Sequence, residues 1–231
     1  MAITDYLELD QIYLQTLGRG LRTLAVCAAN SGEGVSTVAC ALAMRHQQSG
    51  RATLLVDMNL FRPSLNQRFD LARVNWQTDA PSQHQAMITV LPGLDVLTAS
   101  AAPANGFRQL DAIQSMLKQW LIHYDAVVFD TSPLNAINRN NIPAELICAC
   151  SEGALMVVKT AVTRQEELQQ AVSRLKAYQV NVFGVVMNDV AFPPLHAELQ
   201  REIQRIARRL PRFTQWLSLW LKRSSLVNIR I

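Results

Sequence analysis

Short apolar runs alternate with helical patterns along most of this chain. Six runs have the length of buried strands, and they lie at residues 23–29, 53–57, 94–99, 126–130, 153–159 and 182–188. Apolar residues recur at helical spacing between them, near residues 36–49, 107–123, 141–150 and 163–178. Strands that are apolar on both faces and alternate with helices are typical of a parallel sheet covered on both sides. The pattern therefore predicts an α/β fold, a three-layer sandwich with a mostly parallel sheet.

Two further segments depart from this alternation. Apolar residues Leu7, Ile12, Tyr13 and Leu17 stand among polar neighbours, which predicts an amphipathic helix over residues 5–19. The stretch from about residue 72 to residue 92 is polar and lacks a regular period, so we expect an irregular loop there. We divide the chain into an N-terminal amphipathic helix (1–20), a central domain (21–199) and a basic amphipathic C-terminal tail (200–231).

The composition is that of a globular protein, with 49% apolar and 17% charged residues. The net charge of +4 is unevenly distributed: residues 201–231 contain eight Lys or Arg and one acid, whereas the remainder has a slight excess of acids. A mildly acidic body does not suit a nucleic-acid surface, so we expect no nucleic-acid partner.

Membrane and metal signals are weak in this sequence. Neither a signal-peptide pattern nor a run of 18 apolar residues is present. The four cysteines lack zinc-ligand spacing, and buried reduced thiols are typical of a cytosolic protein. We therefore expect a cytoplasmic protein, with peripheral attachment to the inner membrane as an open alternative.

The most informative motif follows the first predicted strand. Residues 24–28 are apolar, residues 30–34 form a small-residue turn, and a helix is expected to open at Ser36. A strand, a Gly-rich turn and a helix N-terminus form a phosphate-binding loop, because backbone N–H groups and the helix dipole favour an anion there. The predicted nucleotide-binding residues in this loop are Ser31, Gly32, Glu33, Gly34, Val35, Ser36 and Thr37.

Val35 departs from the phosphate-loop pattern. A loop of the G-K-[ST] type carries Lys after its last Gly, and that Lys reaches the β- and γ-phosphates. Here the position is Val35. The sequence therefore predicts the architecture of a phosphate loop without the means for fast hydrolysis.

Carboxylates end two of the predicted strands. Asp57 and Asp130 each follow a buried apolar run. An acid in this position is alternatively a turn residue or a helix N-cap. Together with the loop, Asp130 is expected to hold Mg²⁺ with the Ser36 hydroxyl, and Asp57 to be a second acid near the metal. Asn188 ends the last strand, where it either reads the adenine edge or has a structural role.

Taken together, these motifs resemble the bacterial tyrosine kinases (BY-kinases) of capsule and exopolysaccharide systems, within the ParA/MinD-like P-loop ATPases. The resemblance covers roughly residues 10–190. It depends on the motifs Ser31-Gly32-Glu33-Gly34-x-Ser36-Thr37, Leu54-Leu55-Val56-Asp57 with Arg62-Pro63-Ser64-Leu65, Leu91-Pro92-Gly93-Leu94, Tyr124-Asp125-x-Val127-Val128-x-Asp130 and Gly184-Val185-Val186-x-Asn188. The resemblance implies a P-loop NTPase fold, ATP or ADP with Mg²⁺ as ligands, and an inner-membrane polysaccharide co-polymerase or synthase as partner.

Several residues that the family uses are absent. Val35 and Asn30 occupy the two positions where the family and the wider ParA group carry Lys, and Asn59 stands where a second acid is usual. The assembly pattern of the N-terminal helix and the C-terminal tyrosine cluster are also missing, since the last tyrosine is Tyr178. We therefore expect a pseudokinase, not an efficient kinase or ATPase.

The C-terminal tail combines aromatic and basic residues. Phe213, Trp216, Leu217 and Trp220 share one face of a helix at i, i+3, i+4 and i+7. Lys222 and Arg223 flank that face. The pattern suits either an anionic membrane surface or a membrane-protein partner, and a helix packed on the body of the protein is the alternative.

These observations predict a cytoplasmic accessory or regulatory P-loop protein of polysaccharide synthesis and export. One alternative is an active slow ATPase or tyrosine kinase. Another is a ParA/MinD-like positioning factor for a cellulose-secretion, pilus or other envelope machine. Homo-oligomerisation is compatible with each of the three.

Overall fold

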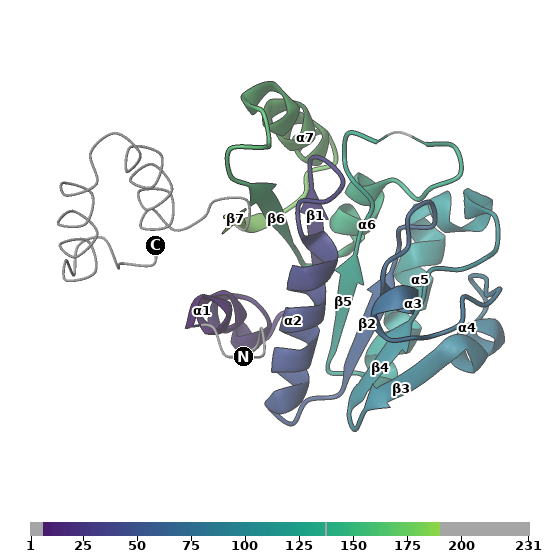
Figure 1. The fold of residues 1–231 in the computed structure, drawn as a ribbon. Coiled ribbons are helices and arrows are strands. Elements are labelled where there is room, and N and C mark those ends of the chain that lie inside the picture. Colours follow the sequence, from purple (N-terminus) through teal and green to yellow (C-terminus); the bar gives the residue numbers. More distant parts are fainter. Residues whose placement is uncertain (1–6, 137, 190–231) are drawn as a thin grey trace, which may run out of the picture. The chain divides into compact units, whose positions relative to one another are not determined.

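The computed structural model describes residues 7–136 and 138–189, and these residues contain one seven-stranded sheet (Figure 1). The strand order is β3-β4-β2-β5-β1-β6-β7, and every neighbouring pair is parallel except β3 and β4. The strands are β1 (Thr23–Ala28), β2 (Thr53–Asp57), β3 (Met87–Leu91), β4 (Leu94–Leu97), β5 (Ala126–Asp130), β6 (Gly153–Lys159) and β7 (Val182–Asn188). The predicted mostly parallel α/β sheet is confirmed.

Helices lie on both faces of the sheet. They are α1 (Leu7–Gln15), η2 (Leu17–Arg19), α2 (Val35–Gln48), α3 (Leu65–Arg68), α4 (Ala80–Ala86), η3 (Ala104–Arg108), α5 (Leu110–His123), α6 (Ala144–Cys150) and α7 (Gln165–Ala177). Alternate side chains of β1 enter different cores: Cys27 packs with side chains of α5, α6 and α7, whereas Val26 packs with those of α1 and α2. This alternation gives three layers, as the sequence predicts.

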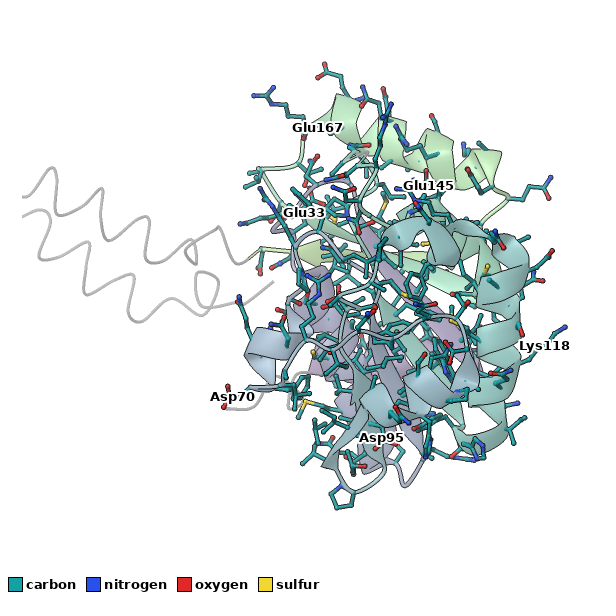
Figure 2. All side chains as sticks on the ribbon, turned by 90° about the vertical axis from the view of Figure 1, so that its right-hand side faces the viewer. Glu33, Asp70, Asp95, Lys118, Glu145 and Glu167 are labelled. Atoms are coloured by element: carbon teal, nitrogen blue, oxygen red, sulfur yellow. The ribbon has the colours of Figure 1, made fainter. Side chains whose placement is uncertain are left out.

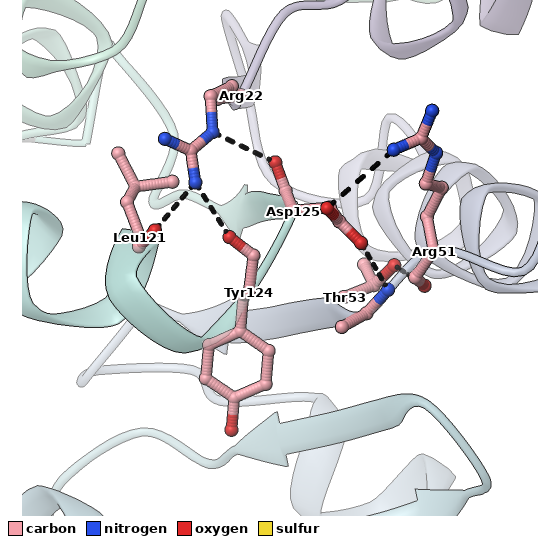
Figure 3. Close-up of polar contacts among 7 residues, drawn as sticks. Arg22, Arg51, Thr53, Leu121, Tyr124 and Asp125 are labelled. Atoms are coloured by element: carbon pink, nitrogen blue, oxygen red, sulfur yellow. Dashed lines mark hydrogen bonds and ion pairs between the residues drawn. The ribbon is translucent and has the colours of Figure 1, made fainter.

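The amino-terminal ends of the central strands are joined by one polar cluster (Figure 3). The Arg22 guanidinium, just before β1, donates to the carbonyl oxygens of Leu121, Tyr124 and Asp125 at 2.6, 3.0 and 3.3 Å. The Asp125 carboxylate accepts from the Ala52 N–H at 2.8 Å, just before β2. These bonds join the amino-terminal ends of β1, β2 and β5 to the end of α5.

The expectation of an irregular loop over residues 72–92 is wrong for its second half, which forms α4 and β3. The Asp79 side chain caps α4 by accepting from the Ser82 N–H at 3.1 Å, and a proline stands in the first turn. Trp76 is fully buried, and its Nε1 donates to the Thr98 carbonyl oxygen at 2.8 Å. The polar composition of this stretch hid a capped helix, whose Gln83 Oε1 accepts from Trp120 Nε1 at 2.9 Å.

The edge strand β7 also differs from expectation. The sequence predicts strands covered on both faces, but Val185 and Met187 are 54% and 63% exposed. The reason is position, since β7 is the last strand of the sheet and pairs, among the described strands, with β6 alone. An apolar run cannot reveal from sequence whether its strand is central or at an edge.

The predicted N-terminal helix is present as α1 and η2, with a different buried face. Tyr13 and Leu17 are buried as expected, and Leu9 joins them, whereas Leu7 is 70% exposed. The tail residues Phe213, Trp216, Leu217, Trp220, Lys222 and Arg223 lie outside the described residues. In the part of the chain that the structure describes, no helix is both long and apolar enough to cross a membrane.

We predict that Trp76→Ala lowers the free energy of unfolding by about 3–5 kcal/mol, because it leaves a cavity and removes the bond to Thr98. Urea unfolding measures the change. Ile122→Ala, at an exposed position of α5, is the control and should change stability little. Equal unfolding midpoints for the two variants would contradict the packing described here.

Candidate functional site

A loop with phosphate-binding geometry links β1 to α2 at the carboxyl edge of the sheet. Gly32 and Gly34 have positive φ angles of 80° and 107°, and α2 begins at the next residue, Val35. The loop borders a cavity of about 360 Å³. The predicted residues that line this cavity are Ser31, Gly32, Gly34, Val35, Ser36, Thr37 and Asp130. The structure therefore brings most of the predicted site residues together.

Asn188 holds this loop from β7. Its Nδ2 donates to the Glu33 carbonyl oxygen at 2.8 Å. A Cβ atom at Gly34 would lie 2.5 Å from the same nitrogen, so a larger residue at position 34 displaces Asn188. The Asn188 amide thus contacts the protein's own backbone, and a contact with an adenine base stays a prediction.

Glu33 points away from the cavity. Its side chain is buried, and its Oε1 accepts from Thr163 Oγ1 at 2.7 Å and from Asn30 Nδ2 at 3.1 Å. Asn30 also donates to Glu167 Oε2 at 2.9 Å, near the start of α7. Figure 2 shows Glu33 and Glu167 at the same end of the domain. These bonds attach the loop to α7, so any ligand contact of Glu33 is made by its backbone.

Asp130 is the predicted metal ligand that faces the cavity. Its Oδ2 accepts from Ser64 Oγ at 3.1 Å, and Ser36 also bonds its carboxylate. Burial, and secondly the Asp57 charge, raise the pKa of Asp130 to about 7, against the opposing effects of the serine hydrogen bonds and Arg68. A carboxylate that is costly to ionise is stabilised by a cation, so the electrostatics suit a metal ion.

Asp57 lies behind Asp130, directly opposite it in the β2–β5 register. It is fully buried, and its oxygens accept from the backbone N–H groups of Asn59, Ser64 and Leu65 at 2.9, 2.9 and 3.2 Å. Burial raises the pKa of Asp57, whereas these hydrogen bonds lower it. Its observed contacts fix the turn after β2, and its predicted role as a metal ligand remains to be tested.

The donor set fits Mg²⁺ better than a transition metal. A hydroxyl from Ser36 and a carboxylate from Asp130 leave most coordination positions for water and phosphate, as Mg²⁺ prefers. Within residues 7–136 and 138–189, no group of three or more His, Cys, Asp or Glu side chains gathers as a metal site. The residues therefore fit a magnesium ion that arrives with a nucleotide.

Two arginines near the cavity were missed as site residues from the sequence. Arg62 lines the cavity from the segment after β2, and Arg68 of α3 donates through Nη2 to Thr37 Oγ1 at 2.9 Å. The sequence feature that could have identified Arg62 is the Arg62-Pro63-Ser64-Leu65 motif. This motif supports the family resemblance, but it has no phosphate-binding pattern of its own. The fold brings both side chains to the loop.

The comparisons with known proteins agree with this fold. The family model of the cellulose biosynthesis protein BcsQ matches residues 21–207. The tyrosine-protein kinase YwqD of Bacillus subtilis (strain 168) is 26% identical over 184 residues, which cover 77% of this chain and 76% of YwqD. The resemblance to bacterial tyrosine kinases is therefore confirmed.

Two solved structures show the same fold at low identity. The chimerical protein CapA2B2 has a TM-score of 0.68 at 23% identity, covering 78% of this chain and 82% of that one. The septum site-determining protein MinD from Pyrococcus horikoshii OT3, complexed with Mg-ADP, has a TM-score of 0.59 at 17% identity, covering 77% and 76%. The predicted ParA/MinD-like fold is thus confirmed.

We predict that Asp130→Asn stabilises the ligand-free protein at pH 8. Burial raises the pKa of Asp130 to about 7 in the folded protein, well above the ordinary value of an aspartate, so the ionised carboxylate destabilises the fold above pH 7. The cost disappears below about pH 4, where both states are protonated. Thermal unfolding should show a midpoint several degrees higher for the variant at pH 8 and a smaller gain at pH 5. Asp70→Asn, at an exposed loop position, is the control, and an equal gain at both pH values would contradict the assignment.

Proposed function

Because the chain belongs to the family of the cellulose biosynthesis protein BcsQ, we propose that it is a nucleotide-binding accessory protein of bacterial polysaccharide synthesis and export. Its ligand is ATP or ADP with Mg²⁺. The observation that carries this proposal is the cavity formed by the Gly32 and Gly34 turn, with Ser36 and Asp130 on its wall. The Mg-ADP complex of the MinD relative supports the choice of ligand.

We assign the nucleotide a binding role and not a fast reaction. Phosphoryl transfer depends on neutralising the charge of the transferred group, and Val35 presents an isopropyl group at the position where a loop of the G-K-[ST] type carries Lys. Losing one such preorganised donor typically costs a factor of about 10²–10³ in rate. Nucleotide binding depends less on this Lys than phosphoryl transfer does, because backbone N–H groups and Mg²⁺ also hold phosphates. The protein is accordingly proposed to be a pseudokinase.

The proposed partner is an inner-membrane polysaccharide co-polymerase or synthase. The YwqD relative is named a tyrosine-protein kinase, and the resemblance to exopolysaccharide kinases implies such a partner. The aromatic and basic residues of the tail are the proposed contact, either with that protein or with anionic lipid. The proposed location is accordingly the cytoplasm, with peripheral attachment to the inner membrane.

A positioning role in a cellulose-secretion machine is the second candidate. The match to the BcsQ family and the MinD-like fold both favour it. A positioning ATPase of this kind requires turnover, and nucleotide-dependent self-association would accompany it. An accessory protein of the first kind needs neither, so ATP turnover separates the two proposals.

We predict that calorimetry detects stoichiometric binding of Mg·ATP and Mg·ADP, while phosphate release stays near the rate of a protein-free control. Val35→Lys should increase turnover without reaching the rate of an efficient kinase, because Asn30 and Asn59 are unchanged. Robust tyrosine autophosphorylation by the natural sequence would contradict the pseudokinase proposal. Failure to bind either nucleotide would refute the proposed ligand.

A separate prediction concerns the tail. Vesicles containing anionic phospholipid should co-sediment the protein, and neutral phosphatidylcholine vesicles should not. The paired change Trp216→Ser and Trp220→Ser should reduce sedimentation severalfold, because it removes the apolar anchors. Equal sedimentation of both proteins would leave a protein partner as the function of the tail.

A further inference from the structure

A positive charge is missing from the phosphate loop but not from the cavity. Residues 30–37 contain neither Lys nor Arg. Across the described residues that line the cavity, the cationic side chain is that of Arg62, which enters from the segment after β2. We propose that Arg62 binds the terminal phosphates of the nucleotide and supplies the charge that Val35 cannot. This inference rests on the proposed nucleotide-binding function.

The turn that carries Arg62 is fixed by buried polar groups. The Asp57 carboxylate accepts three backbone N–H groups on either side of Arg62, from Asn59, Ser64 and Leu65. The Arg62 N–H itself donates to Asn59 Oδ1 at 3.1 Å. The main chain at Arg62 is therefore held in place before any ligand arrives, which reduces the cost of ordering a phosphate contact.

A second connection holds the same turn from the segment before α6. Asn141 Oδ1 accepts from the Leu60 N–H at 2.9 Å, and Asn141 Nδ2 donates to Asn59 Oδ1 at 3.1 Å. These bonds tie the segment after β2 to the segment before α6. Asn59, at a position where an acid is usual in the resembled family, thus has a structural role, and its neutral amide adds no repulsion toward phosphate.

The Arg62 side chain itself is available. It is exposed, and its guanidinium makes no hydrogen bond or ion pair within residues 7–136 and 138–189. Its Cζ lies 5.8 Å from the centre of the Phe61 ring. An arginine presents several donors in a planar fork that matches two phosphate oxygens. Its position and its chemistry both suit the β- and γ-phosphates.

Arg68 is the other arginine near the loop, and its contacts indicate a role other than phosphate binding. Its Nη2 donates to Thr37 Oγ1, and its charge lowers the pKa of the Asp130 carboxyl. Arg68 is not among the residues that line the cavity. It therefore stabilises the first turn of α2 and the metal side of the site, which leaves Arg62 for the phosphates.

Calorimetry on the full chain with Mg·ATP tests the proposal. Arg62→Gln should weaken binding by about 10- to 100-fold, the range for a charge-assisted hydrogen bond. Arg62→Lys should recover part of the loss. AMP affinity should be unchanged by Arg62→Gln, because AMP lacks the phosphates that the guanidinium contacts.

Arg51→Gln is the matched control. It removes the same charge at the amino-terminal ends of the strands, away from the cavity, where Arg51 Nη1 lies 3.8 Å from Asp125 Oδ1 (Figure 3). This variant should leave the affinity for Mg·ATP unchanged. Equal affinities for the Arg62→Gln and Arg51→Gln proteins overturn the inference while the proposed function stands. A loss seen for Arg68→Gln but not for Arg62→Gln overturns it too. No Mg·ATP binding by the natural sequence refutes the proposed function and this inference together.

Discussion

Two carboxylates lie opposite each other at the carboxyl ends of β2 and β5, and both are buried. Placing two acids in a low-dielectric environment is unfavourable unless each charge is compensated. The charge of Asp57 is compensated by three backbone N–H groups of the turn after β2. These hydrogen bonds fix the conformation of the turn that carries Arg62. Asp130 accepts hydrogen bonds from two serine hydroxyls and lines a cavity, where a bound cation would compensate its charge. The arrangement of the site follows from this difference between neighbouring acids.

The loop between β1 and α2 has a defined backbone although position 35 is Val and not Lys. Its backbone is secured on two sides, by Asn188 from β7 and by the Glu33 contacts that lead to α7. None of these bonds involves position 35. The hydrogen bonds that hold the loop therefore do not depend on a Lys at position 35, and the proposed function separates nucleotide binding from hydrolysis on this ground.

The sheet could be predicted from the sequence because buried parallel strands read as continuous apolar runs, and all six expected strands are present. The strand β3 was missed since Met87 to Leu91 follows a polar stretch and pairs at the edge. Ser36 and Asp130 could be placed beside one cavity from the sequence, because their motifs are contiguous with strands. Arg62 could not, because its distance from the loop depends on a turn that Asp57 and Asn141 determine through long-range hydrogen bonds.

The central claim is that the loop after β1 still binds the phosphates of a nucleotide with a magnesium ion. A crystal structure of the full chain grown with Mg·ADP tests it most directly. The account predicts the β-phosphate against the backbone of residues 32–34 and the metal beside Ser36 and Asp130. A structure in which the nucleotide lies away from this loop, or in which the cavity stays free of nucleotide at saturating concentration, would contradict it.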